Sequence, residues 1–513
     1  MSQASRRPSA AGQQSWLGLR PTTLLLLVAI AVLLVPLSAL SQPADSAGPG
    51  GLLARLRSRF GLSQANLGDV DPTSETMRFA TLGLKNVAVT LLWDRANHYK
   101  KVEDWANLSA TLEQMTKLQP NFYSIWDFQA HNLSYNISVE FDDYRDRYGW
   151  VIKGIEFLRQ GIGYNAREPR LLGRMGWFIG QKVGKSDEKK QYRRLFKADD
   201  DFHDRDDPER TLPERDNWLV SRGKYRAGQS LVDGGAPLRT TPLIFHSEPM
   251  MSAINYARAL QDEGEFGPPG SAAWNLAKDE LERFAERDIS TSWGVPIQLR
   301  LREAEQKRAA QRAEELEKLL PGQFAALEES RRAGLTAEQR EAIAVPIMDR
   351  TEAQQQAAAA AEAATKVTWK MVARQAPADV RSRAEELARE YTEASERAEM
   401  IDRYRDIVNF DFWRATCESE VTEPCLRAHE RTWAADREFQ AARLQAAKKA
   451  YEEAFAAWRQ VLDASTILRE DALTADDLAE VVDRYRKLLE QLDEPFPSSF
   501  VLQDVLDRVG PQP

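Results

Sequence analysis

Hydrophobic positions follow two patterns along this chain. Residues 22–40 are almost all Leu, Val, Ile and Ala, and no charged residue lies between Pro21 and Ala44. From about Met77 onward, apolar residues recur at spacings of three and four, which is the period of an amphipathic helix. The sequence therefore predicts an all-α fold, in which one apolar N-terminal helix precedes a long helical body.

The apolar segment 22–40 has the length of a transmembrane helix. Its residues would rise about 28 Å as a helix, close to the roughly 30 Å hydrocarbon core of a bilayer. Three arginines precede the segment, whereas residues 41–51 contain a single charge, Asp45. The positive-inside rule then places the N-terminus in the cytoplasm and the body outside it, as a single-pass protein of the cytoplasmic membrane.

A cleavable signal peptide is the alternative interpretation of this segment. Ala39 and Ser41, on either side of Leu40, are small residues at the spacing that a signal peptidase needs. The apolar run is longer than the roughly 7–15 residues of an ordinary signal-peptide core, which favours an uncleaved anchor. In both interpretations the body is exported.

The part of the body after the anchor contains a degenerate repeat. If Pro120 is position 32 of a repeat, position 8 of three successive units is a small residue, at Ala96, Ala130 and Gly176. Small residues at such positions let two helices approach closely. The spacing resembles that of tetratricopeptide repeats, which are stacked pairs of helices.

The second helix of each repeat unit is less regular than the first. In the second unit, Gly154, Leu158 and Gly161 give the expected small, large, small order at positions 20, 24 and 27. This register requires 12 extra residues in the turn of the unit, near EFDDYRDRYGW. The second helix of the third unit is not recognisable. Near the C-terminus, a further helix pair carries Ala435 at position 8, and Ala447, Tyr451 and Ala454 at positions 20, 24 and 27.

The composition along the chain divides it into segments. We expect a cytoplasmic tail at 1–21, the anchor at 22–40, a linker at 41–76, tetratricopeptide-like helices at 77–195, a polar acidic loop at 196–240, a helical region at 241–296, long charged helices of coiled-coil character at 297–410, and a C-terminal helical region at 411–513.

The acidic loop contains most of the candidate metal-binding residues. Asp199, Asp201, His203 and Asp204 offer oxygen and nitrogen ligands for a cation, which would suit a metal-dependent hydrolase. A solvated acidic loop without a metal is the simpler interpretation, because the spacing fits no known calcium loop. No nucleotide, hydrolase or zinc-protease motif occurs in the chain, so we predict no cofactor and no enzymatic activity.

Two further groups of residues are candidates for local roles. Cys417 and Cys425 flank a turn, and in an exported protein we expect them to form a disulfide. A metal at this pair is not expected, because the adjacent sequence suggests no third ligand. Asn97, Asn132 and Asn136 lie on the first helices of the repeats, where side-chain amides can bind the backbone of a peptide.

Net charge excludes one class of partner. The chain has a formal net charge of −9, which offers no overall basic footprint for a nucleic acid. Helical repeats commonly bind proteins or peptides. The sequence therefore predicts a scaffold that binds protein partners, with a purely structural role in organising the cell envelope as the alternative.

Several longer runs give the chain a wider resemblance. WDFQAHNLSYN, the DDDFH segment, ERDNWLV, PLIFHSEPM, VNFDFW and DEPFPSSF together resemble an uncharacterised family of membrane-anchored proteins from planctomycete-type bacteria. The resemblance covers nearly all of the chain after the anchor. It implies a membrane protein, and it implies no particular activity.

Overall fold

The structure is a computed structural model that describes residues 21–41, 51–52, 55, 85–238, 241–291 and 294–508. The predicted tail, most of the predicted linker and the first residues of the predicted repeat region lie outside these residues. The described chain is helical apart from one short two-stranded sheet, which confirms the all-α fold class. It forms two compact units, unit 1 up to Phe245 and unit 2 from His246 onward.

The predicted anchor coincides with a helix, α1 (Pro21–Ser41). Some of its side chains lie outside the described residues. Within the part of the chain that the structure describes, no helix is both long enough and apolar enough to cross a membrane. The membrane anchor therefore stays a prediction.

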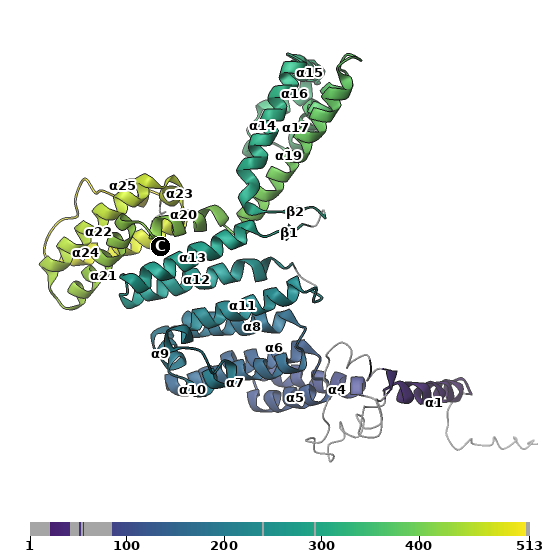
Figure 1. Ribbon diagram of the computed structural model, residues 1–513, viewed down its shortest axis with the longest axis vertical. Helices are drawn as coiled ribbons and strands as arrows, with labels where there is room; N and C mark the ends of the chain where they lie inside the picture. The colour runs from purple at the N-terminus through teal and green to yellow at the C-terminus, as the bar shows by residue number, and fades with distance from the viewer. Residues whose placement is uncertain are drawn as a thin grey trace, which may run out of the picture. The chain divides into compact units, whose positions relative to one another are not determined.

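Unit 1 continues as a series of helices that follow one another across Figure 1. They are α4 (Lys85–Lys101), α5 (Trp105–Leu118), α6 (Tyr123–His131), the π-helix η2 (Asn132–Ile137), the 3-10 helix η3 (Ser138–Glu140), α7 (Tyr144–Tyr164), α8 (Pro169–Trp177), the π-helix η4 (Phe178–Lys182), α9 (Lys189–Lys197), α10 (Asp200–Asp206), the 3-10 helix η5 (Leu212–Arg215) and α11 (Asn217–Asp233).

Neighbouring helices of unit 1 pack as pairs: α4 with α5, α6 with α7, and α8 with α11. Glycines of α7 allow α6 and α7 to approach each other closely. A Cβ added to Gly154 would lie 2.7 Å from the Ala130 carbonyl oxygen, and one added to Gly161 would lie 2.6 Å from Cγ of Trp126. The small residues found in the sequence therefore lie where helices approach each other, as helix pairing requires.

Two sequence predictions about unit 1 were wrong. The extra residues of the second unit do not form a long turn, because η2 and η3 extend α6 to Glu140 and α7 starts at Tyr144. Segment 196–240 is not a loop, since it contains α10, η5 and α11. The polar composition of this segment concealed the apolar face of α11, which buries Trp218, Val220 and Tyr225.

Unit 2 contains the remaining elements. They are α12 (Leu243–Glu263), whose first residues belong to unit 1, α13 (Pro268–Glu286), β1 (Ile289–Ser290), β2 (Pro296–Ile297), the 3-10 helix η6 (Leu299–Leu301), α14 (Arg302–Leu319), α15 (Gln323–Ala333), α16 (Ala337–Ala344), the 3-10 helix η7 (Ile347–Asp349), α17 (Glu352–Thr365), α18 (Trp369–Arg374), α19 (Arg381–Ile407), α20 (Phe410–Glu420), α21 (Glu423–Gln440), α22 (Leu444–Ala464), α23 (Thr466–Glu470), α24 (Ala472–Gln491) and α25 (Gln503–Leu506).

Two bodies make up the later part of unit 2. Helices α14 and α19 pack along each other, and the short helices between them gather at one end of this pair. The strands β1 and β2 pair antiparallel, with Ile289 opposite Ile297. After α19, helices α20 to α25 share one hydrophobic core, in which the predicted helix pair α21 and α22 is present and buries Ala435, Ala447 and Tyr451.

Candidate functional site

The first helices of the three pairs in unit 1 carry a group of aromatic and positively charged side chains that is accessible to solvent. We call this group the aromatic–cationic surface. Each member is at least partly exposed: Trp93, Lys100, Phe128, His131, Tyr135, Arg174, Trp177 and Lys182. In the repeat register predicted from the sequence, Trp93 is at position 5 and both His131 and Trp177 are at position 9, one helical turn later, so the prediction puts them on equivalent faces of successive helices.

Ring contacts connect α4 to α6. The ring centroids of Trp93 and Phe128 are 6.0 Å apart. The ammonium of Lys100 lies 5.0 Å from the centre of the Phe128 ring, within the range of a cation–π interaction. The aromatic faces in this part of the surface are thus accompanied by a positive charge.

A second set of contacts connects η2 to α8 and η4. His131 stacks on Tyr135 at 4.6 Å, and Tyr135 stacks on Trp177 at 5.8 Å. The ammonium of Lys182 lies 4.4 Å from the centre of the Tyr135 ring, and the Arg174 guanidinium lies 4.7 Å from that of Trp177. Three rings and two cations from different helices therefore form one continuous contact chain.

Both π-helical segments of the chain's described part lie at this surface. Tyr135 is in η2, and Lys182 is the last residue of η4. A π-helical turn contains one residue more than an α-helical turn, which rotates the side chains that follow, and such turns occur often at functional sites. The π-helical turns thus help to set the directions of the side chains in the two segments that contain Tyr135 and Lys182.

The charges around His131 are mostly positive. Burial lowers the pKa of His131 below its usual value, and the nearby cations Arg174, Lys100 and Lys182 lower it further, against the opposing effect of Asp127. Asp127 itself is paired with Arg174, whose Nε lies 2.6 Å from its Oδ1. Lys100 and Lys182 thus supply positive charge beyond the pair formed by Arg174 and Asp127.

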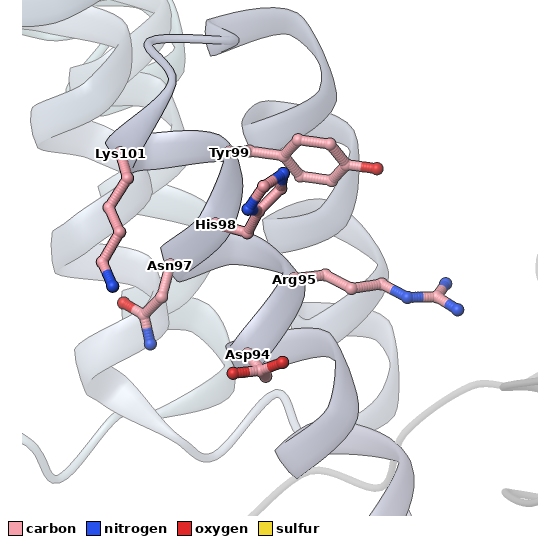
Figure 2. A pocket seen from close by; sticks show the side chains of 6 residues that line it. All are labelled: Asp94, Arg95, Asn97, His98, Tyr99 and Lys101. Atoms are coloured by element: carbon pink, nitrogen blue, oxygen red, sulfur yellow. The ribbon is translucent and has the colours of Figure 1, made fainter.

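Asn97 is exposed on α4, as a partner-binding residue must be, and it borders a shallow hollow of about 360 Å³. The residues that line this hollow all come from α4: Asp94, Arg95, Asn97, His98, Tyr99 and Lys101. Figure 2 shows that they lie on different sides of the helix, with Asn97 and Lys101 on one side and His98 and Tyr99, whose ring centroids are 5.9 Å apart, on another. The hollow therefore has no convergent set of polar groups and is not a site by itself.

Asn132 is buried and cannot reach a peptide, and Asn136 is bonded to it. Asn132 is 1% exposed, and its Oδ1 accepts a hydrogen bond of 3.1 Å from Nδ2 of Asn136. Asn132 also donates to Oε1 of Gln129, at 3.3 Å. The sequence prediction is therefore corrected for Asn132, whose buried amide bonds to Gln129 and Asn136. Asn136 is half-buried, and its amide donates to Asn132.

The predicted metal-binding loop is occupied by interactions within the protein. The His203 side chain is buried, and its Nε2 lies 2.8 Å from the Phe196 carbonyl oxygen while its Nδ1 lies 3.1 Å from Nη1 of Arg210. Since Arg210 can only donate, Nδ1 accepts and Nε2 donates. Burial lowers the pKa of His203 and so favours this neutral form.

The acidic residues near His203 also have partners. Asp199 caps α10 by accepting from the Phe202 amide, and it accepts a hydrogen bond from the Tyr148 hydroxyl at 2.9 Å. Asp200 forms an ion pair with Arg215, and Asp204 lies 3.9 Å from the same guanidinium. Asp201 is exposed. The segment is thus a network of caps and ion pairs, and the proposed set of metal ligands does not converge.

The two cysteines are free thiols and both are buried, so the predicted disulfide is absent. Burial raises the pKa of Cys417 to about 12 and raises that of Cys425 well above its usual value. Cys425 instead lies beside Glu420 and His429, whose ligand atoms and its own are all within 4.8 Å of one another. The expectation that no third ligand is near the cysteines was therefore wrong.

Sequence reasoning missed Arg174, Lys182, Glu420 and His429. The repeat register could have indicated the neighbourhood of Arg174, because His131 and Trp177 occupy the same repeat position. A four-residue spacing on one helix could have indicated the pair of Cys425 and His429. No known protein-family model, curated protein or solved structure matches the chain.

Proposed function

We propose that the chain binds an acidic, extended segment of a partner protein on the aromatic–cationic surface. The observation that carries the proposal is the clustering of Lys100, Arg174 and Lys182 around His131 on a protein whose net charge is −9. A local positive surface on an acidic protein favours a negatively charged partner through charge complementarity. The partly exposed aromatic side chains add apolar contact area, as aromatic residues do in many interfaces.

The proposal includes the membrane tether. With segment 22–40 as an uncleaved anchor, the surface would be held on the extracytoplasmic side of the cytoplasmic membrane, where the partner would be an exported or membrane protein. A tethered repeat protein of this kind acts as a scaffold, and no chemical step is part of the proposed function.

The test uses the full-length protein in detergent and a fluorescein-labelled peptide of alternating Glu and Tyr. Fluorescence anisotropy should show binding that weakens with salt, because screening reduces attraction between exposed charges. Replacing two cations by acids, in Lys100→Glu with Lys182→Glu, should weaken binding by at least about 10-fold, since each close charge contact contributes on the order of 1 kcal/mol.

The matched control is the double variant Lys153→Glu with Lys190→Glu. Both lysines are exposed and lie on α7 and α9, outside the aromatic–cationic surface, and the change in net charge is the same. This control should bind as the unaltered protein does. Equal weakening in both variants, or equal binding of a Lys-Tyr peptide, would contradict the proposal.

A second readout reports the place of binding. The pKa of His131 is lowered by burial and by the surrounding cations, so an anionic peptide bound among them should raise it. The imidazole titration can be followed by NMR with labelled histidine. If the peptide binds while the His131 titration stays unchanged, binding occurs elsewhere and the proposed surface is wrong.

A further inference from the structure

A side-chain cluster in unit 2 has the composition of a metal site. Glu420 is the last residue of α20, and Cys425 and His429 lie in the first half of α21. The turn between the helices returns the chain so that Glu420 faces the helix that carries the other two. One potential ligand atom from each residue lies within 4.8 Å of the others.

The spacing of the two α21 residues suits a shared ion. Residues four apart in a helix lie on the same face, one turn apart, which is the arrangement of the two zinc-binding histidines in the HExxH helix. Ligand atoms around a tetrahedral zinc ion are roughly 3–4 Å apart, given zinc bond lengths of about 2.0–2.3 Å. The three atoms of this cluster, all within 4.8 Å of one another, are close to that separation.

The three side chains of the cluster are mostly buried, but one of them is accessible to solvent. Glu420 is 7% exposed and Cys425 is 2% exposed, whereas the side chain of His429 is 26% exposed and forms an edge open to solvent. Oε1 of Glu420 lies 2.9 Å from Nε2 of His429, and its Oε2 accepts a 2.9 Å hydrogen bond from Nε2 of Gln261. Gln261 thereby fixes the carboxylate, as residues behind a metal ligand usually do.

Electrostatics favours a divalent ion at this place. A buried carboxylate is costly unless positive charge balances it. The ion-pairing partner of Glu420 is the His429 imidazole, and Arg258 also acts on it electrostatically. A divalent ion, the Glu420 carboxylate and a Cys425 thiolate together carry no net charge. We infer that Glu420, Cys425 and His429 form a binding site for a zinc-type divalent cation.

Proton balance follows from the ligand chemistry. Cys425 binds as a thiolate, so one proton leaves Sγ for solvent when the metal–sulfur bond forms. The His429 nitrogen that binds must present its lone pair, so the ring proton resides on the other nitrogen. Three protein ligands leave a tetrahedral ion one further position, which water or another small ligand would occupy.

Cobalt(II) titration of the metal-free full-length protein is the direct test. A thiolate-to-cobalt charge-transfer band should appear and saturate at one equivalent, and zinc should abolish it by displacement. Cys425→Ser should remove the band and weaken cobalt binding by more than about 100-fold, because losing a ligand costs at least as much as losing its supporting residue. His429→Gln should weaken binding similarly.

Cys417→Ser is the matched control, because Cys417 is also buried and lies on α20 near the cluster but is not one of the three ligands. It should keep the band and the stoichiometry. Circular dichroism checks the fold of each variant. The titration of the unaltered protein alone decides whether it binds cobalt through a thiolate. Failure to develop a saturable band, loss of the band in Cys417→Ser, or its persistence in Cys425→Ser would overturn the inference.

Discussion

At the scale of single residues, the glycines of α7 have opposite surroundings. Gly154 faces α6 and η2, where an added Cβ would meet the Ser134 hydroxyl of η2 and, at 2.7 Å, the Ala130 carbonyl oxygen of α6. Gly149 lies on the same helix with no atom within 4 Å of an added Cβ. The same chemical change therefore tests close helix packing at one position and helix propensity alone at the other.

Gly154→Ala should destabilise the protein by about 1–3 kcal/mol, because the backbone of Ala130 cannot yield as a flexible side chain would. Gly149→Ala should stabilise it by about 0.5–1 kcal/mol, because alanine is favoured over glycine inside a helix. Urea unfolding followed by circular dichroism measures both. If Gly154→Ala leaves the free energy of unfolding unchanged, α6 and α7 are not as close as described.

At the scale of helices, a buried arginine joins three elements of unit 2. Arg405 of α19 is 1% exposed, and its guanidinium binds Glu303 of α14 at 3.0 Å, Asp411 of α20, and the Leu299 carbonyl oxygen of η6 at 3.4 Å. Arg414 contacts the same two acids but is 35% exposed. The two arginines thus share partners and differ in burial.

Arg405→Ala should cost about 3 kcal/mol of unfolding free energy, the lower end for a broken buried ion pair, because its acidic partners remain partly solvated. Arg414→Ala should cost less than about 1 kcal/mol, as exposed ion pairs do. Thermal unfolding compares the two variants directly. Equal losses would mean that burial of Arg405 contributes nothing beyond its charge contacts.

The sequence predicted the elements better than the sites. The recurrence of apolar residues at spacings of three and four identified the helices. Small residues such as Gly154 and Ala447 identified the faces at which helices pair. Both features can be read from the local sequence pattern. Helix α11 was missed because its apolar residues are separated by polar ones that bind within the fold. The neighbours Glu420 and His429 of Cys425 were missed because a turn, and not a motif, brings them together.

At the scale of the whole molecule, each unit has a hydrophobic core of its own. Trp126, Leu158 and Phe178 belong to a core in unit 1, whereas Tyr451, Phe455 and Tyr485 belong to one in unit 2. Separate cores are the usual basis for separate cooperative unfolding. The two helical units are therefore expected to respond separately to core mutations.

Calorimetry of the full-length protein should show two thermal transitions. Gly154→Ala should lower the midpoint of one, and Arg405→Ala should lower that of the other, because the two residues lie in different units. Gly149→Ala and Arg414→Ala serve as controls with small shifts. A single transition lowered equally by both destabilising variants would show that the units unfold together.

The wide turns η2 and η4 have a consequence for how this protein can change over evolutionary time. Each holds a surplus residue that the helix could lose while its hydrogen-bonded backbone closed into regular α-form. Deleting one codon there would let the turn close into α-form while the helical segments on either side kept their orientation, because a wide turn accommodates its surplus residue locally. A short deletion at either turn would therefore change the aromatic–cationic surface at that turn alone, without rebuilding the scaffold.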